Sequence, residues 1–177
     1  QVERPGQPPS FVFGTLHSSD ELVTALPPPV TAAFQSAATV ATEVVLDENA
    51  MVALTQAMVL PPGRKLADIL TPEIYSDLKL AAAHYQMSMP VLSRFKPWAL
   101  MALFSLPPAE YKRNRAGLMP LDEMLQNDAR ATNKKLVALE SAEEQIAAFE
   151  SVSEEDQLAL LAITLVEAND IERNFGA

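Results

Sequence analysis

Two short segments with strand-like sequences, residues 11–17 and 40–46, are separated by a stretch that has helical spacing. The first segment is aromatic and β-branched, and it ends on His17, three residues after Gly14. The second alternates between two faces along its length, which is the period-two pattern of a strand. A strand, a helix and a strand in this spacing predict a βαβ unit, whose crossover makes the two strands parallel.

A third strand is predicted over residues 135–140, after a long helical stretch. Residues 50–132 have helical spacing interrupted by prolines, which predicts a helical insertion between the second and third strands. Two further helices follow, and the apolar run 158–166 predicts that the last one is buried. The predicted fold class is therefore α/β, with a small, mostly parallel sheet of about three strands and many helices. So thin a sheet predicts an incomplete domain over residues 10–177, after a flexible arm over residues 1–9.

The charge balance excludes two classes of partner. The 177 residues include 23 acidic and 13 basic ones, a net charge of −10, so neither nucleic acid nor an anionic membrane is expected as the main partner. The chain has no cysteine, which excludes disulfides and thiolate metal sites. No apolar run reaches the roughly 18 residues of a transmembrane helix. The sequence opens on Gln1 and a Pro- and Gly-rich stretch, which predicts a processed N-terminus.

Three polar residues stand at or near the ends of the predicted strands. His17 ends the first strand, Glu43 lies in the second, and Glu140 ends the third. Open α/β sheets bind their ligands at the carboxyl ends of the strands, so these side chains are candidates for metal binding and for acid–base catalysis. Each also has a plainer interpretation. His17 could be structural, Glu43 could be solvated on an edge strand, and Glu140 could serve the dipole of the next helix.

A second group of candidates, Arg94, Lys96 and Trp98, combines two cations with the only tryptophan. These residues could bind a substrate or simply form one face of a helix. The chain has no phosphate-binding loop, no nucleophile elbow and no HExxH zinc motif. A site made of one histidine and two carboxylates would suit Mn²⁺, Co²⁺ or Zn²⁺.

Several segments together resemble the TraB/GumN family, which is related to the Tiki proteins. Residues 14–17 match its N-terminal Gly-x-x-His motif, and Glu43 matches its acidic second strand. Residues 94–98 (Arg-Phe-Lys-Pro-Trp) resemble its Lys-Pro-Trp helix, and residues 139–145 (Leu-Glu-Ser-Ala-Glu-Glu-Gln) resemble its Leu-Glu-Thr…Gln segment. Other matching positions are the group Leu60-Pro61-Pro62-Gly63, Leu66 and Leu70-Thr71-Pro72-Glu73. The match covers most of residues 10–150.

The resemblance implies a metal-dependent hydrolase, peptidase-like, that is periplasmic or secreted. It implies His17 as a metal ligand, Glu43 as a ligand or general base, and Glu140 as a ligand or as a carboxylate that supports one. The family's second Gly-x-x-His is absent from these residues, which predicts an N-terminal portion only. The expected partners are a peptide or small-molecule substrate, the missing C-terminal portion, or a second copy of the chain. The alternative is a non-catalytic exported binding or scaffold protein of the same fold.

Overall fold

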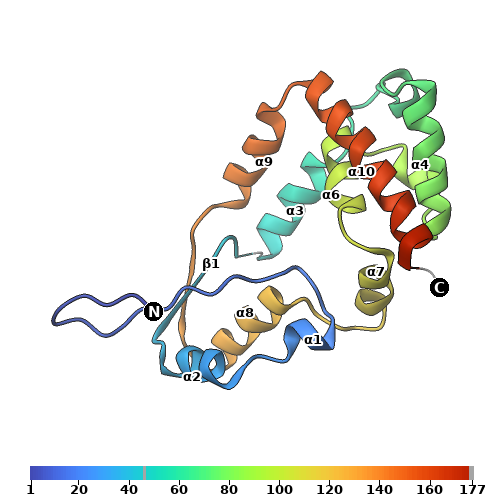
Figure 1. Ribbon diagram of the computed structural model, residues 1–177. Coiled ribbons are helices and arrows are strands. Elements are labelled where there is room, and N and C mark those ends of the chain that lie inside the picture. Colours follow the sequence, from blue (N-terminus) through green and yellow to red (C-terminus); the bar gives the residue numbers. More distant parts are fainter. Residues whose placement is uncertain (46, 176–177) are drawn as a thin grey trace. The chain divides into compact units, whose positions relative to one another are not determined.

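The computed structural model describes residues 1–45 and 47–175, and the chain divides into two compact units. Unit 1 comprises Gln1–Val45 and Lys112–Ser141, and unit 2 comprises Leu46–Tyr111 and Ala142–Ala177. Each unit is therefore assembled from segments that are distant in the sequence. Figure 1 shows the helices and strands in chain order. Within the described residues, every helix is too short or too polar to span a lipid bilayer.

Unit 1 contains the sheet. Its two strands run parallel and in register, so that Val40 lies opposite Leu136. One helix packs against both strands and buries Leu121 and Leu125 beneath them. The small parallel sheet confirms the predicted α/β class. The elements of unit 1 are α1 (Glu21–Thr24), α2 (Pro28–Ser36), β1 (Thr39–Thr42), the packing helix α8 (Leu121–Ala131) and β2 (Lys135–Ala138).

The strand predicted over residues 11–17 is absent, because the described sheet has only β1 and β2. The segment is exposed, with Val12 84% and Leu16 66% accessible to solvent. A strand-like sequence becomes a strand only where a neighbouring backbone accepts and donates the ladder hydrogen bonds, and no ladder forms here. The second predicted strand is also shorter than expected, since β1 ends at Thr42. Leu46, which that prediction included, lies outside the described residues.

Unit 2 is helical, and α10 is its central element. In Figure 1 α10 lies alongside α4 and α6, and the three helices bury the largest part of the core between them. Leu78 of α4, Leu100 and Phe104 of α6, and Leu161 and Leu165 of α10 are almost fully buried. The elements of unit 2 are α3 (Glu48–Ala57), η1 (Leu66–Asp68), α4 (Pro72–His84), α5 (Met89–Leu92), α6 (Pro97–Phe104), α9 (Ala142–Ser151) and α10 (Glu154–Phe175).

Local signals explain where several of these helices begin. The Thr71 hydroxyl accepts a hydrogen bond from the Ile74 N–H and Pro72 occupies the first position of α4, as a capped helix start requires. Asp47 caps α3 in the same way. All elements described between β1 and β2 are helical, in agreement with the predicted insertion. The insertion also contains α7 (Pro108–Arg115), which the sequence analysis did not predict because α7 carries few apolar residues.

The prediction that the last helix is buried on all sides is wrong. Leu161 and Leu165 face the core, whereas Leu160, Ile163 and Val166 are exposed, Ile163 at 57%. The reason is that α4 and α6 both pack within unit 2 against the buried positions of α10. An apolar run reports high hydrophobicity, but the number of neighbouring elements decides how many faces of a helix are covered.

Candidate functional site

The carboxyl end of the sheet brings Glu43 and Glu140 together. Each residue follows its strand, β1 or β2, and the Glu140 N–H donates a 2.8 Å hydrogen bond to the Glu43 carbonyl oxygen. The Leu139 N–H donates in the same way to Thr42, at 2.9 Å. Both glutamates are exposed, so neither carboxylate needs a buried partner to compensate for lost hydration. The two acids therefore share one edge of the sheet as solvated groups.

The segment just beyond Glu43, at the end of β1, is anchored from α8. Gln126 is buried, and its side-chain amide donates a 3.0 Å hydrogen bond to the Val44 carbonyl oxygen. This bond satisfies a backbone acceptor that the short strand β1 leaves behind. It fixes the chain immediately after Glu43, and so it positions the backbone on which that carboxylate stands.

His17 lies beside Asp122, which was not among the predicted site residues. Its Nδ1 lies 3.2 Å from the Oδ1 of Asp122, in the first turn of α8. The Leu121 N–H donates to the Ser18 carbonyl oxygen at 3.0 Å, which ties the histidine segment to the start of that helix. The Asp122 Oδ1 atom is itself buried and has no conventional hydrogen bond among the described residues, so its approach to the imidazole is a close contact and not an aligned hydrogen bond.

This contact bears on the tautomer of the imidazole. A carboxylate beside Nδ1 favours the tautomer that carries the proton on Nδ1, and it leaves the Nε2 lone pair for a metal ion or a proton. The histidine side chain is 63% exposed, so Nε2 is open to ligands. In the sequence Asp122 is one of two acids after Pro120, a pattern that indicates only a favourable helix dipole. The sequence alone therefore contains no signal for the contact between Asp122 and His17.

The predicted substrate-binding residues lie in unit 2, and two of the three line one open pocket of about 380 Å³. Trp98 is only 2% exposed and forms part of the pocket wall, where it stacks on Phe149 with ring centroids 5.0 Å apart. Lys96 lines the same pocket and forms an ion pair with Glu150. Arg94 is exposed and does not line the pocket, although its carbonyl oxygen accepts a backbone hydrogen bond within the same unit.

Comparison with protein families decides the relationship. The model of the TraB/PrgY/gumN family matches residues 1–176. The chain belongs to the TraB/PrgY/gumN family. This membership confirms the resemblance seen in the sequence motifs, which extended over most of residues 10–150.

Two curated relatives are similar to this TraB/PrgY/gumN chain at low identity. Metalloprotease TIKI1 of Danio rerio is 26% identical over 93% of the chain. Metalloprotease TIKI1 of Homo sapiens is 29% identical over 78% of the chain. The alignments cover 38% and 32% of those proteins, so the chain spans about a third of the length of the relatives it matches. No solved structure matches the chain.

The metal that this family resemblance implies can be tested against the donor atoms present. Within residues 1–45 and 47–175, no three side chains of His, Asp or Glu come together in a way that could hold a metal ion. His17 has one carboxylate beside it, on Asp122, and that carboxylate lies on Nδ1. The described residues therefore do not make a complete metal site. The predicted ligands in unit 1 are the exposed imidazole of His17 and the exposed carboxylates of Glu43 and Glu140.

Proposed function

We propose that the protein is a peptidase-like hydrolase that depends on a divalent metal ion, and that this chain supplies part of its site. The supporting observation is His17, whose Gly-x-x-His motif ends on an exposed imidazole that has a carboxylate beside Nδ1. Family membership and the similarity to two proteins named metalloproteases support the hydrolase class. The proposal extends to a periplasmic or secreted location and to a peptide substrate.

In this proposal His17, Glu43 and Glu140 have separate roles. His17 binds Mn²⁺, Co²⁺ or Zn²⁺ through Nε2, and Asp122 holds the imidazole from the other side. Glu43 is a ligand or the general base, and Glu140 supports it from the adjacent strand end. Because these residues do not complete a donor set, the proposal needs further ligands. A second copy of the chain, or another part of a longer protein, would supply them.

The proposed organisation of the chain follows the same reasoning. Residues 10–177 form the N-terminal portion of a TraB/GumN-like α/β domain, after an arm over residues 1–9. The helical insertion over about residues 50–132 carries Lys96 and Trp98, which contribute to substrate binding together with Arg94. The proposed reacting groups thus belong to unit 1, and the proposed substrate contacts belong to unit 2.

The proposal is tested by metal titration of the full-length encoded protein. Calorimetry with Mn²⁺, Co²⁺ and Zn²⁺ is expected to show binding that His17→Ala weakens by about tenfold or more. His84→Ala is the matched control, since His84 is the other histidine of the chain and lies on α4 of unit 2. Equal affinity of the wild type and His17→Ala contradicts the ligand role. Cleavage of a peptide library by the metal-loaded protein, abolished by chelation, tests the hydrolase class itself.

A second candidate function is a non-catalytic binding or scaffold protein of the same fold. It is favoured by one observation, which is that the described acids and His17 do not converge into a set of three. The same library separates the two candidates. Peptides that bind but stay intact in the presence of each metal favour the scaffold, whereas defined cleavage products favour the hydrolase.

A further inference from the structure

We infer that the open pocket beside Trp98 binds a basic side chain, lysine or arginine, of a peptide. The walls of this pocket, called the Trp98 pocket below, include Pro61, Lys96, Trp98, Glu150 and Glu154. The inference rests on the proposed function in one respect, because that proposal makes the ligand a peptide. It adds the class of side chain that the peptide carries.

One wall of the Trp98 pocket is held by backbone hydrogen bonds. The Leu60 N–H donates to the Arg94 carbonyl oxygen at 2.8 Å, and the Lys96 N–H donates to Met58 at 2.8 Å. These bonds form a short antiparallel bridge between two segments of unit 2. Because the bridge leads directly into Pro61 on one side and into helix α6 on the other, this wall is preorganised.

The opposite wall, from the α9–α10 junction, presents hydrogen-bond acceptors. The Glu150 carboxylate accepts from Lys96, and the Glu154 carboxylate accepts from Arg64 at 2.9 Å. A carboxylate has about four lone-pair positions, so each glutamate can accept a further donor without losing its present partner. Gln157 donates through its amide nitrogen to two backbone carbonyls, which leaves its Oε1 as an additional acceptor.

The exposure of the Lys96–Glu150 ion pair in the Trp98 pocket also favours an incoming cation. The Lys96 side chain is 25% exposed, whereas that of its partner Glu150 is 44% exposed. The negative end of this pair is therefore the one that a ligand meets first. The second pair gives no such bias, since the Arg64 and Glu154 side chains are 50% and 52% exposed.

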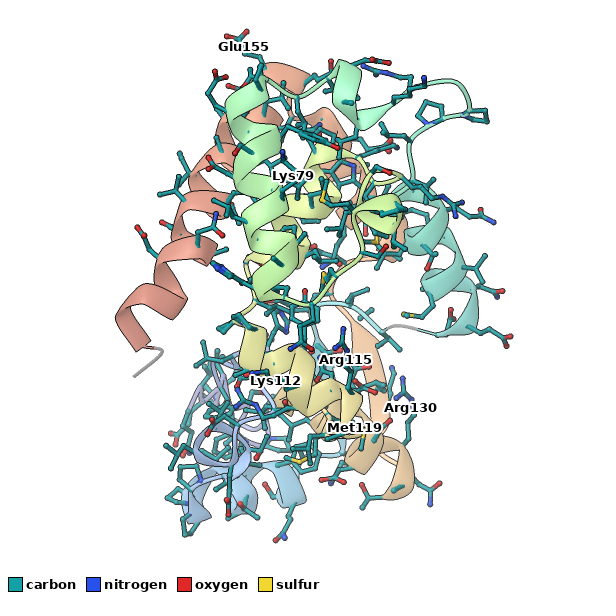
Figure 2. All side chains as sticks on the ribbon, turned by 90° about the vertical axis from the view of Figure 1, so that its right-hand side faces the viewer. Lys79, Lys112, Arg115, Met119, Arg130 and Glu155 are labelled. Carbon is teal, nitrogen blue, oxygen red and sulfur yellow. The ribbon has the colours of Figure 1, made fainter. Side chains whose placement is uncertain are left out.

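The acidic residues near the pocket are concentrated on its α9–α10 side. Residues 142–157, which form α9 and the start of α10, contain six acidic residues and no lysine, arginine or histidine. Figure 2 shows one of them, Glu155, projecting outward at the start of α10. The other wall, residues 58–65 and 94–98, contains four basic residues and no acidic one, so the acidic excess steers cations to the α9–α10 side of the pocket. The net charge of −10 adds to that effect.

The apolar lining selects the shape of the cation. Pro61, Pro97 and Trp98 provide apolar surface beside the charged groups. Lysine and arginine combine a methylene stem, which gains from contact with such surface, with a terminal donor that needs a carboxylate. A small inorganic cation would use only the carboxylates, so the lining favours a side chain over a free ion.

The chain contains its own reporter for this site, because Trp98 is its only tryptophan. The test titrates the full chain, without metal, with the blocked peptide acetyl-Ala-Ala-Lys-Ala-Ala-amide and follows both tryptophan fluorescence and calorimetric heat. The lysine peptide is expected to bind, with an affinity that falls as salt rises. Peptides with acetyl-lysine or glutamate in its place are expected to bind about tenfold more weakly or less.

Matched variants locate the binding. Glu150→Gln is expected to weaken the lysine peptide by about threefold or more. Glu143→Gln, on the same helix but outside the pocket lining, removes the same charge and is expected to leave the affinity within about twofold. Circular dichroism checks that both variants keep the wild-type fold.

Three results would overturn the inference: no heat and no fluorescence change with the lysine peptide, equal affinity for the lysine and glutamate peptides, or equal effects of the two variants. Binding without any cleavage would leave the inference intact while contradicting the hydrolase proposal. Metal-dependent cleavage together with any one of those three results would contradict the inference and leave the hydrolase proposal intact.

Discussion

At the scale of the residue, Tyr111 shows how burial in unit 2 changes a titration. Burial, reinforced by the nearby Tyr85, raises the pKa of the Tyr111 phenol from 10.0 to about 12. The hydroxyl donates a hydrogen bond to the Leu103 carbonyl oxygen, and the two tyrosine rings meet edge to face. The phenol is neutral when protonated, so the folded state resists its ionisation.

The stability that follows from this raised pKa has a definite pH window. It is fully present below pH 10, where the unfolded chain still keeps the proton, and it is lost as the pH rises towards 12. We expect a loss of at most about 2 kcal/mol in the free energy of unfolding, after allowing for the partial exposure of the ring. Urea unfolding at pH 9 and pH 11.5 measures this loss.

Tyr111→Phe should abolish the part of the alkaline loss of stability that is due to the phenol. It should also lower the free energy of unfolding by about 1 kcal/mol at pH 9, because the Leu103 carbonyl oxygen loses its donor. Tyr75→Phe, on the same unit, is the control and should keep the wild-type difference between the two pH values. An identical alkaline loss in the wild type and Tyr111→Phe would show that the buried phenol is not responsible.

A second prediction at this scale concerns the partner of His17. Replacing Asp122 by Asn removes the anion beside Nδ1, so the neutral imidazole should shift from the Nδ1–H towards the Nε2–H tautomer. Long-range proton–nitrogen NMR at pH 8.5 distinguishes the two tautomers, and the spectrum of His84 provides an internal reference. If the tautomer of His17 is the same in both proteins, the carboxylate does not orient the ring.

At the scale of the element, the helix starts could be predicted because their signals are local. Thr71 and Pro72 mark the start of α4 within a few residues, and Asp47 does the same for α3. The strand over residues 11–17 could not be predicted correctly, since strand formation depends on a partner segment elsewhere in the chain. α7 was missed for the opposite reason, because its charged sequence lacks the apolar period that identifies helices.

Part of the candidate site could be predicted from the sequence, and part could not. The adjacency of Glu43 and Glu140 was predictable, because parallel strands end at one edge of a sheet. The contact of His17 with Asp122 joins segments that are distant in the sequence, and an acid in a first turn has a sufficient local explanation. The Trp98 pocket could not be predicted either, because the glutamates that pair with its cations come from a later part of the chain.

The one-sided burial of α10 gives a prediction for a single helix. Leu165→Ala removes a fully buried side chain and should lower the free energy of unfolding by about 2–5 kcal/mol. Ile163→Ala on the exposed face is the matched control and should cost less than about 1 kcal/mol. Urea unfolding followed by circular dichroism measures both. Equal costs would mean that the exposed face of α10 is covered in solution.

At the scale of the whole molecule, each unit has its own core. The main cluster of buried apolar residues lies entirely within unit 2, whereas α8 of unit 1 buries Leu121, Leu125 and Ala129. The chain passes from unit 1 to unit 2 and back before it ends in unit 2. The metal-dependent role proposed for unit 1 and the peptide-binding role proposed for unit 2 therefore belong to units with separate cores.

This separation predicts two cooperative units in hydrogen exchange. Leu165→Ala should speed the exchange of amides in α4, α6 and α10 and leave those of β1, β2 and α8 near their wild-type rates, because the lost contacts belong to the core of unit 2. Leu125→Ala should speed the exchange of amides in β1, β2 and α8 and leave those of α4, α6 and α10 near their wild-type rates. Native-state exchange followed by mass spectrometry resolves the two sets of peptides. If either substitution accelerates exchange uniformly across the chain, the two units unfold as one, and changes in either proposed site would then reach the other through stability alone.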